Sequence, residues 1–501
     1  MRWKRYKACL AVLRQVFGVP GFRPGQKAAV NALLSGRDVL CILPTGAGKS
    51  LCWQLPAVMR PGLTVVVSPL IALMDDQVQS LKRRGVPAAT LNSLMTRQEL
   101  ADAEKQVRTG TVRILLVSPE RLETAGFLSL CTSCPPQLLV VDEAHCVVQW
   151  GGEFRPPYSR IGAFMEQLPR RPVVCAMTAT ADRDMQREIC DSLALRRPRR
   201  VMMPVMRENL RYSVRTTTDR TGEILRILHS DPSRTVIFCR SRARTEQLAA
   251  VLRREGYAAE YYHAGLTREE RLKAQERFRS GATACLAATT AFGMGVDIPD
   301  VRRVIHDSLP DTVIDLVQQS GRAGRDLLPA DCVILIAPEE LMRSGRVLHA
   351  MHASTRLAPL RRSALMRTHW RPLRTLLNAC LTRRCIPAAL SEAFGQRSRP
   401  CGCCSACTDG PLLRRVPRLP AMDAASLRLW LLLWQREAIA EKLGVPPDRI
   451  ITRGALREAA RSMTLPPIRQ PQARQAMQRL LQTIVRASVR QPGRGSAQHG
   501  P

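Results

Sequence analysis

The chain has 501 residues, of which 45% are hydrophobic, so it is long enough to bury several cores, and we expect three or four domains. Its formal charge of +34, with arginine spread along the whole chain, predicts a nucleic acid partner rather than a lipid surface. The sequence contains neither a secretory signal nor a stretch of about 18 uninterrupted apolar residues, which argues against a secreted or membrane-spanning protein. We therefore expect a cytoplasmic protein, associated with the nucleoid if the source is bacterial.

Near the N-terminus, two features suggest a nucleotide site. A helical pattern over residues 27–35 follows the segment Phe22-Arg23-Pro24-Gly25-Gln26. The Gln26 amide offers one acceptor and two donors, which match the edge of adenine. The apolar run 39–43 then leads into the glycine-spaced segment Leu43-Pro44-Thr45-Gly46-Ala47-Gly48-Lys49-Ser50.

This glycine-spaced segment has the pattern of a phosphate-binding loop. Glycines at 46 and 48 allow the backbone to curl so that several N–H groups point at one anion, and a helix beginning near Lys49 adds its positive end. Lys49 is predicted to reach the β and γ phosphates, and the Ser50 hydroxyl to hold Mg²⁺. Leu43 stands where the strict pattern has its first glycine.

Further strands and helices alternate after this loop. Apolar runs over 64–68, 113–118, 137–141 and 173–177, with a helix over about 71–84, predict a parallel sheet covered on both faces. The run 137–141 ends in Asp142 and Glu143. Asp142 is predicted to hold Mg²⁺, usually through water, and Glu143 to accept a proton from the water that attacks the γ phosphate. Taken alone, such an acidic pair is as often a helix cap.

An aromatic segment follows the acidic pair. Gln149, Trp150, Phe154, Arg155 and Tyr158 fall within ten positions of a chain that is only 4% aromatic. Such a loop can stack bases and pair with phosphates, at about 1 to 3 kcal/mol per stacked base. Trp150 is the better candidate for a base contact, because packing beneath a loop explains Phe154 and Tyr158 nearly as well.

The order of these motifs resembles the RecQ-type DNA helicases of superfamily 2. The likeness covers about residues 9–410 and includes the segments at 22–26 and 44–50, Ser68–Gln77, Asp142–His145, the aromatic loop, and Met177–Ala181. The resemblance implies binding of ATP and Mg²⁺ by Arg23, Gln26, residues 43–50 and Asp142. Two departures are Val19, where the family often has an aromatic residue, and Gly152, where it often has a histidine.

The alternation of strands and helices restarts at Glu208 and predicts a second doubly wound domain. Strands are expected over 235–239, up to 262, over 285–289 and over 301–306. The resemblance implies that Gln318, Arg322 and Arg325 act in catalysis. It places Arg322 and Arg325 across the interdomain cleft, with Arg325 or both acting as arginine fingers on the γ phosphate. It also implies a nucleotide contact for Asp297 and a DNA contact for His263. Without the resemblance, two arginines in a basic protein would more often form a solvated face.

The segment 341–420 has 15 arginines, no lysine and only two acids, Glu392 and Asp409. Within it, Cys401, Cys404 and Cys407 are each separated by two residues, so their thiolates can converge from a tight turn on Zn²⁺. Cys385 can complete a tetrahedron, with Cys380 and Cys403 as competitors, and the resemblance favours Cys385. We expect most of the other cysteines, such as Cys41, Cys175, Cys239 and Cys332, to be buried and unreactive.

A Pro/Arg linker over 411–420 precedes a helical pattern that resembles the HRDC module of RecQ proteins. The interval is too short for the winged-helix domain that typical relatives have there. The predicted fold is α/β, with two tandem RecA-like doubly wound domains, a small helical zinc-binding subdomain and a C-terminal helical HRDC-like bundle. The expected boundaries are 1–206, 207–338, 339–411 and 424–489, with a disordered tail over 490–501.

The expected function is that of an ATP-dependent 3'-5' DNA helicase that translocates on single-stranded DNA and unwinds duplexes in repair or recombination, as the resemblance implies. Two alternatives remain open, an RNA helicase and an ATP-gated DNA-binding or annealing protein with little unwinding. The expected partners are single-stranded and duplex DNA.

Overall fold

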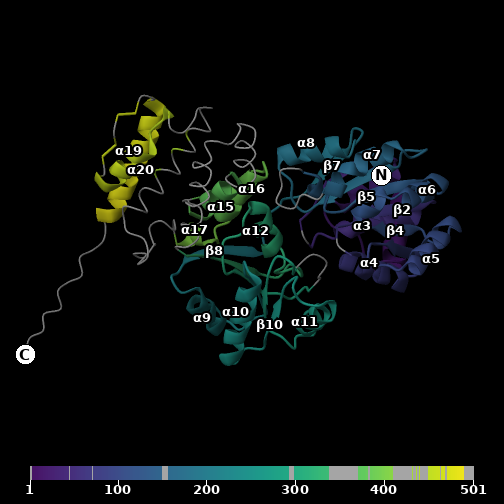
Figure 1. Ribbon diagram of the computed structural model, residues 1–501, viewed down its shortest axis with the longest axis horizontal. Coiled ribbons are helices and arrows are strands. Elements are labelled where there is room, and N and C mark those ends of the chain that lie inside the picture. The colour runs from purple at the N-terminus through teal and green to yellow at the C-terminus, as the bar shows by residue number, and fades with distance from the viewer. Residues whose placement is uncertain are drawn as a thin grey trace, which may run out of the picture.

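The structure is a computed structural model. It describes residues 3–44, 46–69, 71–148, 156–292, 298–337, 371–381, 384–409, 432, 436, 439, 449–462, 464–465, 467–468 and 471–489. Two α/β domains lie side by side, small helices cover one side of the second, and a pair of C-terminal helices lies at the end far from the first (Figure 1). None of the described helices is both long and apolar enough to cross a membrane.

The first domain is built on a seven-stranded parallel sheet in the order β3-β4-β2-β5-β6-β1-β7. Its strands are β1 (Val39–Ile42), β2 (Leu63–Val67), β3 (Ala88–Leu91), β4 (Ile114–Val117), β5 (Pro136–Val141), β6 (Val173–Thr178) and β7 (Arg199–Met202). Its α-helices are α1 (Trp3–Gln15), α2 (Gln26–Leu34), α3 (Lys49–Met59), α4 (Ile71–Arg83), α5 (Arg97–Arg108), α6 (Ala125–Ser133), α7 (Ile161–Glu166) and α8 (Arg183–Ser192), and its 3₁₀ helices are η1 (Pro119–Glu123), η2 (Ala144–Val147) and η3 (Pro156–Arg160).

Strand β1 shows how the sheet is buried on both faces. Val39 and Cys41 belong to one apolar core, whereas Leu40 and Ile42 belong to the core on the opposite face. Because side chains alternate along a strand, such a double-sided strand reads as a continuous apolar run. The predicted parallel sheet is therefore confirmed for this domain.

The second domain has a six-stranded parallel sheet in the order β10-β11-β9-β12-β13-β8. The strands are β8 (Leu210–Thr216), β9 (Thr235–Phe238), β10 (Ala259–Tyr262), β11 (Cys285–Ala288), β12 (Arg303–His306) and β13 (Ala330–Ile336). The helices are α9 (Arg220–Ser230), α10 (Arg242–Arg254), α11 (Arg268–Ser280) and α12 (Val313–Ser320). The second doubly wound domain is thus also confirmed.

Four strands were missing from the sequence prediction, namely β3, β7, β8 and β13. Strand β7 has the sequence Arg-Arg-Val-Met with only Val201 buried, because it lies at the edge of its sheet. Strand β8 is the edge strand of the second sheet and alternates buried and exposed residues. Edge strands lack the double-sided apolar run by which central strands are recognised. Strand β13 has such a run and could have been predicted.

Helices α15 (Arg371–Leu381), α16 (Ile386–Ala393) and α17 (Ser405–Thr408) form a subdomain that shares its core with the second domain. Leu376, Leu377 and Leu390 pack in the same apolar cluster as Leu316 of α12 and Val214 of β8. The Ser405 hydroxyl also accepts a hydrogen bond from the Val214 backbone N–H at 3.0 Å, which caps the edge strand β8.

The C-terminal helices α19 (Arg453–Ser462) and α20 (Pro471–Val489) lie side by side (Figure 1). They contribute to a separate small core that includes Leu432, Leu456 and Met477. The buried Arg436 donates a hydrogen bond to the Ile451 carbonyl at 3.1 Å. These elements are helical, as predicted, but the HRDC identity stays a prediction. The linker 411–420 and the tail 490–501 lie outside the described residues.

His306 provides a test of the second domain's packing. It is fully buried at the end of β12, with Nδ1 at 3.0 Å from Gln319 Oε1 and Nε2 at 3.2 Å from Ser320 Oγ. Burial lowers the pKa of His306 to about 4, against about 6.5 in an unfolded chain. Between these pH values the unfolded state binds a proton that the folded state does not, so stability falls as pH falls from about 6.5 towards 4.

We predict that the domain loses about 2 kcal/mol through this residue between pH 7 and pH 5, since each pH unit below the unfolded pKa costs about 1.4 kcal/mol. Hydrogen exchange of β12 and β13, corrected for intrinsic rates, measures this loss. His306→Asn should be less stable at pH 7 but should lose about 2 kcal/mol less on acidification. An equal loss in the variant and the wild type would contradict the assignment.

Candidate functional site

The phosphate loop connects β1 to α3 at the carboxyl edge of the first sheet. Gly46 and Gly48 have φ angles of 85° and 74°, in the left-handed region that favours glycine. A Cβ atom on Gly48 would lie 2.6 Å from Gln26 Nε2, so a side chain cannot fit there. Helix α3 begins at Lys49, as predicted, with Ser50 in its first turn. Thr45 lies outside the described residues.

Arg23 and Gln26 support this loop through side-chain hydrogen bonds to its carbonyl groups. Arg23 Nη1 donates to the Gly46 carbonyl at 2.8 Å, and Gln26 Nε2 donates to the carbonyls of Ala47 and Gly48 at 3.1 and 3.0 Å. Gln26 Oε1 accepts from the Arg23 backbone N–H at 2.8 Å, and the residue is 1% exposed. The Gln26 amide thus supports the loop in this structure. Its contact with adenine stays a prediction.

The two acids lie at the end of β5, facing the loop. Lys49 Nζ is 3.9 Å from Glu143 Oε1. Glu143 has a φ of 47°, which is uncommon for a residue with a side chain and is typical of strained functional positions. Burial and the neighbouring Glu143 raise the pKa of Asp142 to about 6. Burial also acts to raise the pKa of Glu143, but the charges of Lys49, His145 and Arg322 outweigh it and lower that pKa.

Sequence reasoning missed the residues that orient these acids. His145 Nδ1 lies 3.3 Å from Glu143 Oε2 and 3.0 Å from the Thr178 hydroxyl at the end of β6. The Tyr158 hydroxyl donates to the Asp142 carbonyl at 3.0 Å, and Tyr158 is fully buried. The packing interpretation of Tyr158 is therefore correct. His145 and Thr178 were visible as motif residues, but the sequence did not indicate their contact.

The second domain brings its arginine loop to the phosphate loop. The loop follows α12, and Arg325 Cγ lies 3.6 Å from the position that a Cβ atom on Gly46 would take. Arg322 is close enough to Glu143 to lower its pKa. The structure therefore places both predicted finger arginines beside the nucleotide site. Gln318 lies half-buried on α12, and Asp297 lies outside the described residues.

Arg207 and Asn209, which sequence reasoning also missed, brace this arginine loop. Arg207 donates to the carbonyls of Ala323 and Gly324, the second at 3.3 Å. Asn209 Nδ2 donates to the carbonyls of Gly324 and Leu328 at 2.9 and 2.8 Å. Arg207 Nη1 also lies 3.4 Å from the position of a Cβ atom on Gly46. Arg207 therefore lies between the phosphate loop and the arginine loop.

The segment 203–209, which links the two sheets, is also bonded to the cysteine-containing subdomain. Gln396 Oε1 accepts from the Val205 N–H at 2.9 Å, and Gln396 Nε2 donates to the Met203 carbonyl at 3.0 Å. Met203 N–H in turn donates to the Ile42 carbonyl at the end of β1, at 3.1 Å. The segment 203–209 thus connects the first sheet, the cysteine-containing subdomain and the arginine loop.

Four cysteines form the second candidate site. The Sγ atoms of Cys385, Cys401, Cys404 and Cys407 all lie within 4.8 Å of one another. Cys404 Sγ is 4.0 Å from Cys385 Sγ and 3.5 Å from Cys407 Sγ. Zinc bound tetrahedrally by thiolates at about 2.3 Å separates the sulfurs by about 3.8 Å, so the four positions suit this ion.

Backbone N–H groups donate hydrogen bonds to sulfurs of this cluster. The N–H groups of Cys401 and Cys404 lie 3.2 and 3.3 Å from Cys385 Sγ and Cys401 Sγ. Burial acts to raise the pKa of Cys401, but the N–H groups of Cys403 and Cys404 and the neighbouring thiols outweigh it and bring the pKa down to about 7, whereas burial raises the pKa of Cys385 and Cys404. Cys403 is exposed and outside the cluster, and Cys380 is buried in the apolar core. The other cysteines predicted as core residues, Cys41, Cys175, Cys239 and Cys332, are indeed buried.

The predicted DNA contacts fall mostly outside the described part of the chain. This holds for Gln149, Trp150, Phe154 and Arg155. His263 is described and is 4% exposed, with Nε2 at 2.8 Å from Glu246 Oε1. In this conformation its ring faces the protein rather than solvent. A DNA contact by His263 stays a prediction and requires the side chain to leave this pair.

Comparisons with known proteins follow the same division of the chain. A family profile described as "DEAD/DEAH box helicase" matches residues 23–188, and one described as "Helicase conserved C-terminal domain" matches residues 219–326. Among solved structures, the DUF1998 helicase MrfA bound to DNA is similar with a TM-score of 0.56 at 20% identity, over 66% of this chain and 48% of that one. Dbp5 of S. cerevisiae, bound to RNA and ADP BeF3, is similar with a TM-score of 0.54 at 16% identity, over 68% and 90%. At such identities the likeness concerns the fold alone.

Curated relatives are more similar in sequence. The ATP-dependent DNA helicase RecQ of Pasteurella multocida is 36% identical over 81% of this chain and 63% of its own length, and that of Haemophilus influenzae is 35% identical over 80% and 64%. The chain therefore spans somewhat less than two thirds of these two relatives. RecQ of Synechocystis is 40% identical over 66% of this chain and 72% of its own length. The chain therefore belongs to the RecQ family.

Proposed function

We propose that this protein is an ATP-dependent DNA helicase that moves 3' to 5' along single-stranded DNA and opens duplexes in repair or recombination. The observation that supports it best is the meeting of the phosphate loop and the acid pair of one domain with the arginine loop of the other. A site divided between two domains links the state of the nucleotide to their separation, which a motor requires. RecQ relatives, named as ATP-dependent DNA helicases, supply the substrate class.

The residues present fit ATP and Mg²⁺. Gly46 and Gly48 curve the loop through positive φ angles, a Cβ atom on Gly48 would press against the Gln26 amide, and α3 directs its positive end at the loop. Ser50 and Asp142 supply the oxygen ligands that Mg²⁺ prefers. When bound, Mg²⁺ neutralises charge on the phosphate oxygens. Lys49 binds the terminal phosphates, and Glu143 accepts the proton of the attacking water.

The arginine loop completes the chemistry in this proposal. Arg322 and Arg325 bind the γ phosphate through their forked guanidinium groups, and Arg207 positions the loop through the carbonyls of Ala323 and Gly324. Because fingers act on charge that develops during transfer, their placement affects turnover more than ground-state binding.

Zinc fits the four cysteines by donor type, number and spacing. We propose that zinc stabilises the subdomain that carries Gln396, and that the C-terminal helices form an HRDC-like DNA-binding module. The predicted linker over 411–420 is too short to hold a winged-helix strand separator. We therefore propose that unwinding depends on a single-stranded 3' tail.

The first experiment compares wild type, Lys49→Ala and Glu143→Gln on duplexes with a 3' tail, a 5' tail or no tail, with matched RNA duplexes. Wild type should hydrolyse ATP in response to single-stranded DNA and should unwind the 3'-tailed DNA best. Lys49→Ala should lose hydrolysis. Glu143→Gln should bind ATP but turn it over at least about 100-fold more slowly, because a general base contributes about 10² to 10⁴.

Glu166→Gln, which neutralises an exposed acid on α7, is the matched control and should behave like the wild type. Turnover by Glu143→Gln within a few-fold of the wild type would refute the role of Glu143. ATPase stimulation without directional unwinding would favour an annealing protein, and preferential opening of RNA would favour an RNA helicase.

The second experiment concerns Arg207. We predict that Arg207→Gln lowers kcat of the DNA-stimulated ATPase about 10-fold or more while KM for ATP changes little, because the finger loop loses its support. Arg207→Lys should recover only part of the rate, since one ammonium group cannot reproduce the fork that bonds two carbonyls. Arg187→Gln on the exposed face of α8 is the control. An unchanged kcat in Arg207→Gln would exclude the positioning role.

The third experiment concerns the metal. Purified protein should contain about one zinc per chain, and Cys404→Ser should lose it together with solubility or DNA binding. Cys403→Ser, which alters the exposed neighbour outside the cluster, should keep both zinc and activity. Elemental analysis of both variants provides the measurement. Soluble, active wild-type protein without zinc would rule out the site.

A further inference from the structure

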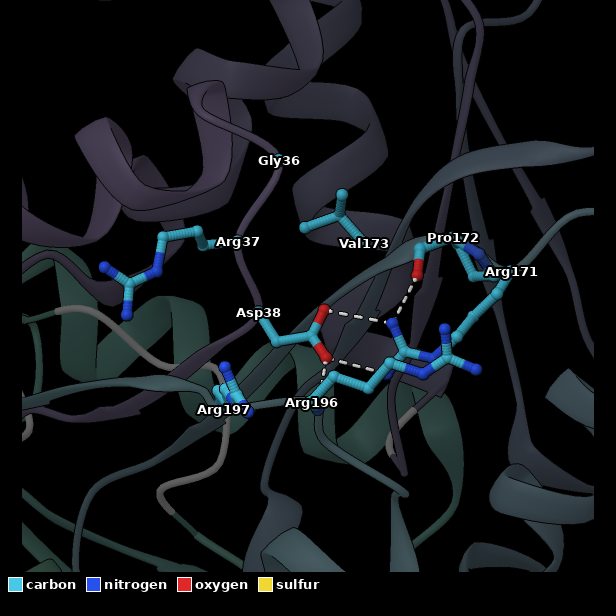
Figure 2. Close-up of a pocket in the computed structure, with 8 residues that line it drawn as sticks. All are labelled: Gly36, Arg37, Asp38, Arg171, Pro172, Val173, Arg196 and Arg197. Carbon is cyan, nitrogen blue, oxygen red and sulfur yellow. Dashed lines mark hydrogen bonds and ion pairs between the residues drawn. The ribbon is translucent and has the colours of Figure 1, made fainter.

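A second concave site lies at the opposite edge of the first sheet from the phosphate loop. It is a pocket of about 580 Å³ at the amino ends of β1, β6 and β7, lined by Gly36, Arg37, Asp38, Arg171, Pro172, Val173, Arg196 and Arg197 (Figure 2). Strand β6 has six residues and spans about 20 Å, so the pocket is separated from the nucleotide site by the length of the sheet. It is therefore not part of the ATP site.

Asp38 is the only acid in this pocket, and its hydrogen-bonding capacity is already used. Its Oδ1 accepts from Arg171 Nη1 at 3.2 Å and from the Val174 N–H at 2.9 Å. Its Oδ2 accepts from Arg171 Nη2 at 2.6 Å and from the Arg196 N–H at 2.7 Å (Figure 2). Asp38 is 3% exposed. This carboxylate thus joins the starts of three strands and pairs with Arg171. It does not neutralise the charges of the other arginines that line the pocket.

The guanidinium groups of Arg37, Arg196 and Arg197 have no acidic partner within 4 Å among the described residues, and all three residues are exposed. Figure 2 shows Arg37 and Arg197 on one side of Asp38, and Arg171 and Arg196 on the other. The neighbouring Arg170, Arg199 and Arg200 are also exposed. Like charges gathered around a hollow cost free energy unless an anion binds between them.

We infer that this arginine pocket binds backbone phosphates of a nucleic acid strand outside the cleft between the two domains. Guanidinium groups bind phosphate oxygens in a fork, and every lining cation is an arginine. Apolar side chains are limited to Pro172 and Val173, so the pocket lacks the hydrophobic anchor site that a peptide ligand usually needs. The inference rests on the proposed function for the identity of the polyanion.

The fold offers a nucleic acid strand a path to this pocket. Helix α8 touches the cysteine-containing subdomain, since Arg183 Nε lies 3.3 Å from the position of a Cβ atom on Gly395. From there α8 runs ten residues, about 15 Å, and the chain reaches Arg196 four residues after its end. A nucleic acid strand held by the cysteine-containing subdomain can therefore extend along this side of the first domain.

The test replaces the three exposed arginines together, as Arg37→Gln, Arg196→Gln and Arg197→Gln, and leaves Arg171 and Asp38 in place. The control protein carries Arg14→Gln, Arg83→Gln and Arg254→Gln, which remove the same charge from scattered exposed positions. Fluorescence anisotropy measures the binding of labelled oligothymidylate to both full-length proteins over a range of salt concentrations. One oligonucleotide is too short to contact both the cysteine-containing subdomain and the pocket, and another is several times longer.

For the long strand, the pocket variant should show a salt slope of log K against log [salt] that is smaller than that of the control by about 2, because three lost phosphate contacts remove about 0.7 each. For the short strand the two proteins should match, and kcat of the ATPase at saturating DNA should be unchanged. Equal slopes for both proteins on the long strand would overturn the inference.

Binding of a labelled polyglutamate peptide that is lost only in the pocket variant, with DNA binding intact, would also overturn the inference and would identify an acidic protein as the ligand. If DNA failed to stimulate the ATPase of the wild type, the proposed function would fail. The pocket would then still be judged on its salt slope, so the two failures can be told apart.

Discussion

The hydrogen bonds of the segment 203–209 connect the first sheet, the cysteine-containing subdomain and the arginine loop of the second domain. Met203 extends the pairing of β7 with β1 by donating to the Ile42 carbonyl, and Gln396 bonds the backbone of Met203 and Val205. Arg207 and Asn209 bond the carbonyls of the arginine loop. Each of these bonds has a backbone atom as one partner. The segment is therefore tied to the main chain of its neighbours. These bonds couple the position of the arginine loop to that of the segment 203–209.

The electrostatics of the acid pair follow from this contact between the two domains. Burial penalises the charges of Asp142 and Glu143, and cations from both domains offset that penalty at Glu143. Lys49 belongs to the same domain as the acids, whereas Arg322 comes from the other. The attraction between Glu143 and Arg322 thus contributes to domain contact, and its strength depends on how close the domains lie. A phosphate in the cradle would compete with Glu143 for the same cations.

Much of the site could be predicted because its parts are contiguous in the chain. The phosphate loop, the acids after β5 and the cysteine spacing each depend on residues a few positions apart, and the structure brings the four predicted sulfurs together. The central strands were predictable from their apolar runs. The edge strands β7 and β8 were not, because a strand with one neighbour and exposed residues lacks that run. Gln26 was noticed as a polar residue with the right donors, but its bonds to the loop were not foreseen.

The sequence by itself determined the backbone of the cradle, since Gly46 and Gly48 adopt positive φ angles that other residues disfavour, and its apolar runs indicated most of the central strands. Only the tertiary structure decided the role of Arg207, which acts on carbonyls more than 100 positions away, and the pairing of Asp38 with Arg171 across 133 positions. The physical reason is that local patterns encode dihedral preference and burial, whereas these contacts depend on where parallel strands and two domains bring distant backbone together.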